Sequence, residues 1–140
     1  MTNTVVIDTS VLISALIGTK GPNREVIRGC LNGTYNPLIS NALFQEYEDV
    51  TKRENILELC PLTEAEITEL LNALYSVCQW VQIYYLWRPN LPDEDDNFLV
   101  ELAVAGNATC IVTNNVKHIK ASELSFPDLH VLTPEELLRG

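Results

Sequence analysis

The sequence has little positive charge, no long apolar run and no repeats. Nine basic residues stand against 19 acidic ones, for a net charge of −10, which argues against broad non-specific binding to a polyanion. The longest apolar stretches fall far short of a bilayer span, and no basic segment precedes an apolar one at the start. Neither a membrane location nor export is therefore expected. The 140 residues suit a single domain over 1–140.

The sequence also lacks any CxxC pair. Its four cysteines are far apart, and Cys78 and Cys110 lie in apolar surroundings. This pattern favours buried free thiols in a reducing cytoplasm over a zinc site or disulfides. We therefore expect a cytoplasmic protein.

Strand-like and helical segments alternate along the chain. The β-branched run at 4–7 indicates a buried strand of a parallel sheet. A capping box at 63–66 predicts an amphipathic helix whose apolar series ends at Cys78, and Ser40 or Asn41 is a candidate cap for an earlier helix. The remaining expected elements are strands at 37–40, 80–87, 109–113 and around 130–132, helices at 10–17, 24–31, 42–51 and 97–105, and a second capping box at 133–136. This alternation predicts βα units around a central parallel sheet.

Acids and amides stand at the ends of several of these segments. Asp8 directly follows the first strand, and Glu46 lies in the helix after the second. An acidic run ending at Asp96 opens the apolar helix before the fourth strand, and Asn115 follows that strand. Because open α/β sheets place their ligands at the carboxyl ends of the strands, these side chains are candidates for one site.

Taken singly, each acid has a plain structural explanation. Asp8 suits an Asx-type turn or a cap as well as a ligand, Glu46 suits a solvated surface acid, and the run 93–96 suits a helix N-terminus. Acids gathered at one sheet edge, however, would repel one another without a cation. Oxygen ligands of this kind favour Mg²⁺ or Mn²⁺ over zinc, and such ions promote phosphodiester hydrolysis.

The order and spacing of four short motifs resemble those of a PIN domain, in particular the VapC-like toxin components of toxin–antitoxin pairs. The motifs lie at 6–12, at 43–47, at 93–99 with Ala103, and at 111–115, so the resemblance covers nearly the whole chain. It implies a three-layer α/β/α domain with a central parallel sheet. It also implies an Mg²⁺- or Mn²⁺-dependent ribonuclease, a small antitoxin partner and a homodimer.

The resemblance carries over to individual site residues. The three acids of the family's metal site match Asp8, Glu46 and Asp96. The accompanying hydroxyl positions match Thr9, Ser10 and Thr113. A fourth acid is common two residues after that last threonine, where this chain has Asn115. The amide can still bind a metal or orient water, but the lost charge should weaken metal binding unless Asp93 points inward and compensates.

Basic residues near the same sheet edge are candidates for RNA contacts. Lys117 and Lys120 follow the fourth strand, and Lys20 and Arg24 follow the first. They can form a local basic rim for phosphates, although ordinary solvated side chains explain them slightly better. His118 is a candidate proton donor, but a loop histidine without a special role is the simpler interpretation.

Three functions follow from these observations. The leading hypothesis is a metal-dependent endoribonuclease, and the second is a catalytically weak PIN module that binds RNA or an antitoxin, motivated by Asn115. A phosphatase or receiver-like domain phosphorylated at Asp8 is disfavoured because Ser10 stands where such a phosphatase needs a second acid. The aromatic residues of the segment 80–87 are expected to pack in the core or in a dimer interface rather than to stack on bases. They are Trp80, Tyr84 and Trp87.

Overall fold

Five parallel strands form one sheet in the computed structural model, which describes residues 3–18, 21–83, 97–116 and 128–140. The strand order is β3-β2-β1-β4-β5. The strands are β1 (Asn3–Ile7), β2 (Tyr35–Ile39), β3 (Gln79–Trp80), β4 (Cys110–Val112) and β5 (His130–Leu132). The chain therefore builds outward from β1 in one direction and then returns to build in the other, which makes β1 the centre of the sheet.

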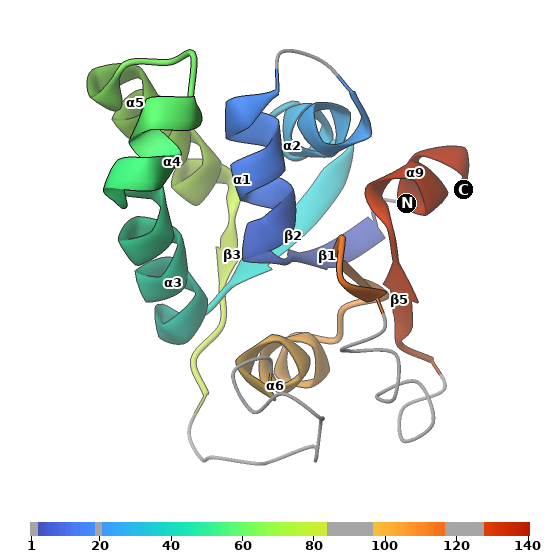
Figure 1. Cartoon of the computed structure of the whole chain (residues 1–140). Coiled ribbons are helices and arrows are strands. Elements are labelled where there is room, and N and C mark those ends of the chain that lie inside the picture. Colours follow the sequence, from blue (N-terminus) through green and yellow to red (C-terminus); the bar gives the residue numbers. More distant parts are fainter. Residues whose placement is uncertain (1–2, 19–20, 84–96, 117–127) are drawn as a thin grey trace.

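Helices cover both faces of this sheet. In the described ranges they are α1 (Thr9–Ile17), α2 (Pro22–Leu31), α3 (Asn41–Thr51), α4 (Glu54–Leu59), α5 (Glu64–Val77), α6 (Asn97–Ala105) and α9 (Pro134–Arg139). Figure 1 shows α6 on one side of the sheet and α1 and α2 on the other. Helix α6 contacts β1, β2 and β4, and α2 contacts α1, α5 and α9. The predicted three-layer α/β/α fold with a parallel sheet is confirmed.

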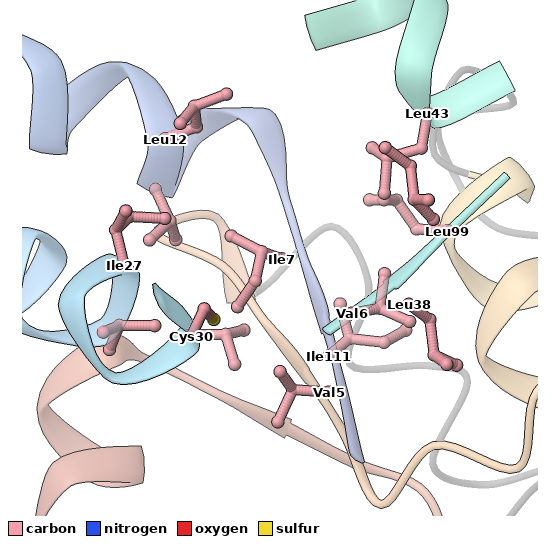
Figure 2. Packing of buried hydrophobic residues seen from close by; sticks show 14 of the residues in the cluster. Val5, Val6, Ile7, Leu12, Ile27, Cys30, Leu38, Leu43, Leu99 and Ile111 are labelled. Carbon is pink, nitrogen blue, oxygen red and sulfur yellow. The ribbon is translucent and has the colours of Figure 1, made fainter. Parts of the chain in front are cut away.

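The apolar run of β1 is buried on both faces. Val5, Val6 and Ile7 are almost fully buried, because successive strand side chains point to opposite faces and each face has a helical cover. Figure 2 shows Val5 and Ile7 on the side of Ile27 in α2, and Val6 on the side of Leu99 in α6. The continuous apolar pattern of this strand is thus a direct consequence of its central place in the sheet.

The predicted helix caps are confirmed. Of the two candidates before α3, Ser40 is the cap, and its Oγ accepts a hydrogen bond from the backbone N–H of Leu43 at 3.3 Å. Both capping boxes form, at 63–66 before α5 and at 133–136 before α9. These side chains satisfy amide groups that the first turn of a helix leaves without a partner.

The predicted strand at 80–87 is wrong in its length. The strand β3 spans only Gln79–Trp80, residues 81–83 are not strand, and 84–87 lie outside the described residues. Trp80 is also not a core residue, because 49% of its surface is exposed. It lies on the edge strand of the sheet and packs against Phe44, with ring centroids 5.5 Å apart. Tyr84 and Trp87 lie outside the described residues.

Helix α4 has no counterpart among the expected elements. Its six residues, Glu54–Leu59, include none that is buried. A helix without a buried face leaves no apolar period in the sequence. Helix α2 also begins two residues earlier than expected, with Pro22 at its start, a position that proline favours.

The four cysteines are free thiols, as predicted, but only Cys30 and Cys110 are buried, whereas Cys60 and Cys78 are partly exposed. Burial raises the pKa of Cys30 to about 12 and that of Cys110 to about 11. Thiols with such pKa values are unreactive near neutral pH. Over the parts of the chain that the structure describes, no helix is both long and apolar enough to cross a membrane.

Candidate metal centre

The carboxyl end of β1 lies between the carboxyl ends of β2 and β4. The pairs Val5–Pro37 and Ile7–Val112 set the register of the three strands. Continuing these pairings along the chain by three residues from Val5 and by one from Ile7 places Ser40 and Thr113 on either side of Asp8. The strand order also reverses at β1, and open α/β sheets bind their ligands at such a switch point.

Asp8 presents a buried carboxylate at this position. Only 8% of the residue is exposed. Its Oδ2 accepts hydrogen bonds from Ser10 Oγ at 2.9 Å and from Thr113 Oγ1 at 2.6 Å. Both side-chain hydrogen bonds that Asp8 makes within the described residues go to Oδ2, which leaves Oδ1 for another ligand.

The structure excludes the cap among the interpretations of Asp8 that the sequence leaves open. Asp8 is the N-cap residue of α1, yet its side chain makes no capping hydrogen bond to the described backbone. Instead, hydroxyl donors from two different segments orient the carboxylate. The carboxylate is therefore not a helix cap, and its role as a metal ligand stays a prediction.

Thr113 connects Asp8 to the position of the missing fourth acid. The residue is fully buried, and its Oγ1 donates to Asp8 while accepting from the backbone N–H of Asn115 at 2.9 Å. Asn115 itself is exposed. Two hydrogen bonds through one hydroxyl thus hold Asn115 beside the carboxylate of Asp8.

Asn114 is a positioning residue that the sequence interpretation missed. Its backbone N–H donates to Ser10 Oγ at 3.2 Å, and its side-chain Nδ2 donates to Asn23 Oδ1 at 2.9 Å and to the carbonyl of Ser10 at 3.3 Å. These bonds fix the segment after β4 to α1 and α2. Of the two adjacent asparagines, the sequence pattern indicates only Asn115 as a site residue, because it stands where a fourth acid is common in PIN domains.

Tyr47 connects helix α3, which carries Glu46, to strand β1, which ends directly before Asp8. Glu46 is half-buried on α3. The adjacent Tyr47 is buried, and its hydroxyl donates to the carbonyl of Ile7, the residue before Asp8. Burial raises the pKa of Tyr47 well above its ordinary value, so that the hydroxyl remains a donor. In the sequence, Tyr47 is one of several apolar residues that recur along the expected helix at 42–51, and nothing in that pattern predicts this hydrogen bond.

We expect Tyr47→Phe to lower the free energy of unfolding by about 1–2 kcal/mol, because it leaves a buried carbonyl without its donor. Thermal unfolding should show a drop of a few degrees. Tyr75→Phe is the matched control, since the Tyr75 hydroxyl donates to Glu48 Oε2 at 2.7 Å in a partly exposed pair and water can replace it there. Equal unfolding temperatures for Tyr47→Phe and the unchanged protein would contradict this role.

Several predicted site residues lie outside the described ranges. Among the described residues, no group of three or more His, Cys, Asp or Glu side chains lies close enough to hold a metal ion. The assignment of metal ligands therefore stays a prediction. The predicted site residues that lie outside the described ranges are Asp93, Asp96, Lys20, Lys117, His118 and Lys120.

The described residues nevertheless fit a divalent cation. Asp8 offers an oxygen that the hydrogen-bonding hydroxyls leave available, and oxygen donors suit Mg²⁺ and Mn²⁺. The next residue, Thr9, has a buried hydroxyl without a hydrogen-bond partner in the described part of the chain. A buried polar group of this kind calls for a bound ligand or water.

Arg24 has structural contacts of its own. Its Nη1 donates to the carbonyls of Ala15 at 3.2 Å and of Gly18 at 2.7 Å. The guanidinium therefore ties α2 to the end of α1, where carbonyl groups lack intrahelical partners. A contact between Arg24 and RNA stays a prediction.

Glu101 is a second buried acid that the sequence interpretation passed over. It lies on α6 and is buried, and together with Ser40 it lines a cavity beside the sheet edge. Acids are rarely buried without a partner or a function. The available signal was its place as the only charged residue of an otherwise apolar helix, Asn97–Ala105.

Comparisons with known proteins agree with this geometry. The family model of the PIN domain matches residues 4–117. Among solved structures, a chain in the crystal structure of VapBC2 from Rickettsia felis bound to a DNA fragment from their promoter is similar, with a TM-score of 0.59 and 15% sequence identity. The match covers 93% of this chain and 98% of that chain. No curated protein sequence matches. Because the family model extends from β1 past β4, the chain belongs to the PIN-domain family.

Proposed function

We propose that this protein is a metal-dependent endoribonuclease that hydrolyses phosphodiester bonds of RNA. PIN domains are typically nucleases that depend on divalent metals, and the chain is a PIN domain. The observation that carries the proposal is the Asp8 carboxylate, which is buried at the switch point of the sheet and oriented by Ser10 and Thr113 rather than used as a cap. In this proposal Asp8, Glu46 and Asp96 hold Mg²⁺ or Mn²⁺, with Asp93 as an additional ligand.

The described residues have distinct tasks in this proposal. A bound divalent ion supplies charge stabilisation at the phosphoryl oxygens and a lowered pKa of water. Ser10 and Thr113 hold Oδ2 of Asp8 and would leave Oδ1 to bind the cation. Thr113 holds the backbone of Asn115, and the exposed side-chain amide of Asn115 would orient the attacking water.

We also propose that the protein is the toxin of a toxin–antitoxin pair. The family match and the likeness in fold to a chain of VapBC2 support this proposal. A small antitoxin would then cover the metal centre and block it, and two copies of the chain would form a homodimer. The alternative is a PIN module that binds RNA or an antitoxin without efficient cleavage, which the neutral side chain of Asn115 favours.

Metal removal tests the proposed reaction. We expect the protein with Mn²⁺ to cleave single-stranded RNA, and chelation by EDTA to lower the rate by at least about 100-fold, because the ion supplies several kcal/mol of charge stabilisation. Excess Mn²⁺ should restore the rate, and calorimetry should detect Mn²⁺ binding independently of activity. Cleavage that persists in EDTA would contradict the mechanism. Absence of both binding and cleavage at millimolar Mn²⁺ would favour the alternative.

A further inference from the structure

A cavity of about 510 Å³ reaches Ser40, at the same carboxyl edge of the sheet as Asp8. It is lined by residues of β3, the segment after it, the start of α3 and α6: Ser40, Asn41, Ala42, Trp80, Val81, Gln82, Ile83, Phe98 and Glu101. Ser40 directly follows β2 and Asp8 directly follows β1, and these two strands are parallel neighbours. The cavity and Asp8 therefore lie at the same edge of the sheet.

The walls of the cavity combine an aromatic face with a few polar groups. Trp80 is half exposed. Phe44 supports it from the protein side, with ring centroids 5.5 Å apart, and Tyr75 in turn lies 4.9 Å from Phe44. This row of rings limits the movement of the indole. Asn41 and Glu101 add hydrogen-bonding groups to the apolar lining, the composition that small planar ligands find in their sites.

The charge distribution favours recognition through bases over recognition through phosphates. The chain has a net charge of −10, and no lysine or arginine of the described residues lines the cavity. Among the described residues, Lys52 pairs with Glu48 and Arg53 pairs with Asp49. Stacking of bases on aromatic side chains, in contrast, requires no positive charge and contributes about 1–3 kcal/mol per base.

We propose that this cavity binds a nucleobase of the single-stranded RNA substrate, stacked on Trp80 next to the phosphodiester at Asp8. The proposal rests on the proposed function, because it places the base relative to the scissile bond. It makes Trp80 a substrate-binding residue, with Asn41 facing the edge of the base. The position of the cavity at the same sheet edge as Asp8 argues for RNA rather than a protein segment as the occupant.

Binding without cleavage tests this inference apart from the reaction. In Asp8→Asn protein without metal, we expect Trp80→Ala to weaken the binding of a single-stranded RNA of about ten nucleotides by about tenfold, as expected for the loss of one stacked base. Trp80→Phe should retain most of the affinity. Leu59→Ala is the matched control, because Leu59 is 61% exposed and lies on α4, away from the cavity. With Trp87→Phe as background, quenching of Trp80 fluorescence by RNA should report the stacking directly.

The outcomes separate this inference from the proposed function. Scanning an abasic site along the RNA should identify one position at which the unchanged protein and Trp80→Ala bind equally. In the active protein, Trp80→Ala should raise KM about tenfold with little change in kcat. If Trp80→Ala binds RNA as tightly as its parent, the cavity belongs to another occupant such as a protein segment and the inference is wrong, even where cleavage itself is intact. If base-dependent binding occurs without any cleavage, the inference stands and the proposed reaction is wrong.

Discussion

Asp8→Asn is expected to lower metal-dependent RNA cleavage by at least about 100-fold, equivalent to about 2.7 kcal/mol of transition-state stabilisation. The reason lies in the two hydroxyls that donate to Oδ2, from Ser10 and Thr113. An asparagine keeps these two hydrogen bonds only if its oxygen takes the place of Oδ2. Its NH₂ group then takes the place of Oδ1 and points a donor at the cation. Mn²⁺ affinity measured by calorimetry should fall together with the rate.

Asp49→Asn is the control for the loss of one negative charge. Asp49 lies on the same helix as Glu46, but its side chain is 70% exposed and pairs with Arg53. A surface substitution of this kind changes stability by no more than about 0.5 kcal/mol, and it should leave the cleavage rate close to that of the unchanged protein. Equal metal-dependent cleavage by Asp8→Asn and its parent would contradict the role of Asp8.

The sheet could be predicted because its central strand leaves a clear pattern. A run such as Val5–Ile7 that is apolar at every position fits only a strand covered on both faces, and the structure places β1 there. The last strand was likewise predicted at its observed bounds, His130–Leu132. The bounds of the edge strand β3 were not, because the partial alternation that begins at Trp80 continues through 81–83, where the structure has no strand.

The contacts of the site needed the order of the strands. Asp8 and Thr113 are each recognisable as polar residues at a strand end, yet they are 105 positions apart. Only the placement of β4 beside β1 brings the hydroxyl to the carboxylate. The bond from Tyr47 to Ile7 depends in the same way on how α3 crosses the sheet. Residue types at strand ends thus predict the candidates, whereas the sheet topology selects the partners.

Glu101 illustrates a different reason for a missed residue. A helix that is apolar nearly all round is expected to be buried, and α6 indeed covers a face of the sheet. That expectation applies to every position of the helix, including its one acid. The pattern of the helix therefore gives no reason to separate this acid from its apolar neighbours, and the structure places it in the wall of the cavity, together with Ser40.

Asn115→Asp is expected to tighten Mn²⁺ binding by at least about tenfold, or about 1.4 kcal/mol. The backbone N–H of Asn115 reaches Asp8 through a single hydroxyl, that of Thr113. A carboxylate there would add one negative charge within a few ångströms of the proposed ion, and at that range charges interact by several kcal/mol even at a partly exposed site. Part of this attraction offsets the loss of hydration, which is why we expect a smaller net gain.

Asn107→Asp is the matched control for this change. It adds the same charge to the same chain, but Asn107 is exposed and lies before β4, at the opposite end of that strand from Asn115. Asparagine and aspartate both tolerate its positive φ of 59°. Calorimetry should therefore show tighter Mn²⁺ binding for Asn115→Asp alone, with faster cleavage at low Mn²⁺. Equal affinities for the two variants would mean that position 115 does not face the metal. In that case the missing fourth acid would no longer favour a weak catalytic centre, and the activity would depend on Asp8, Glu46 and Asp96 alone.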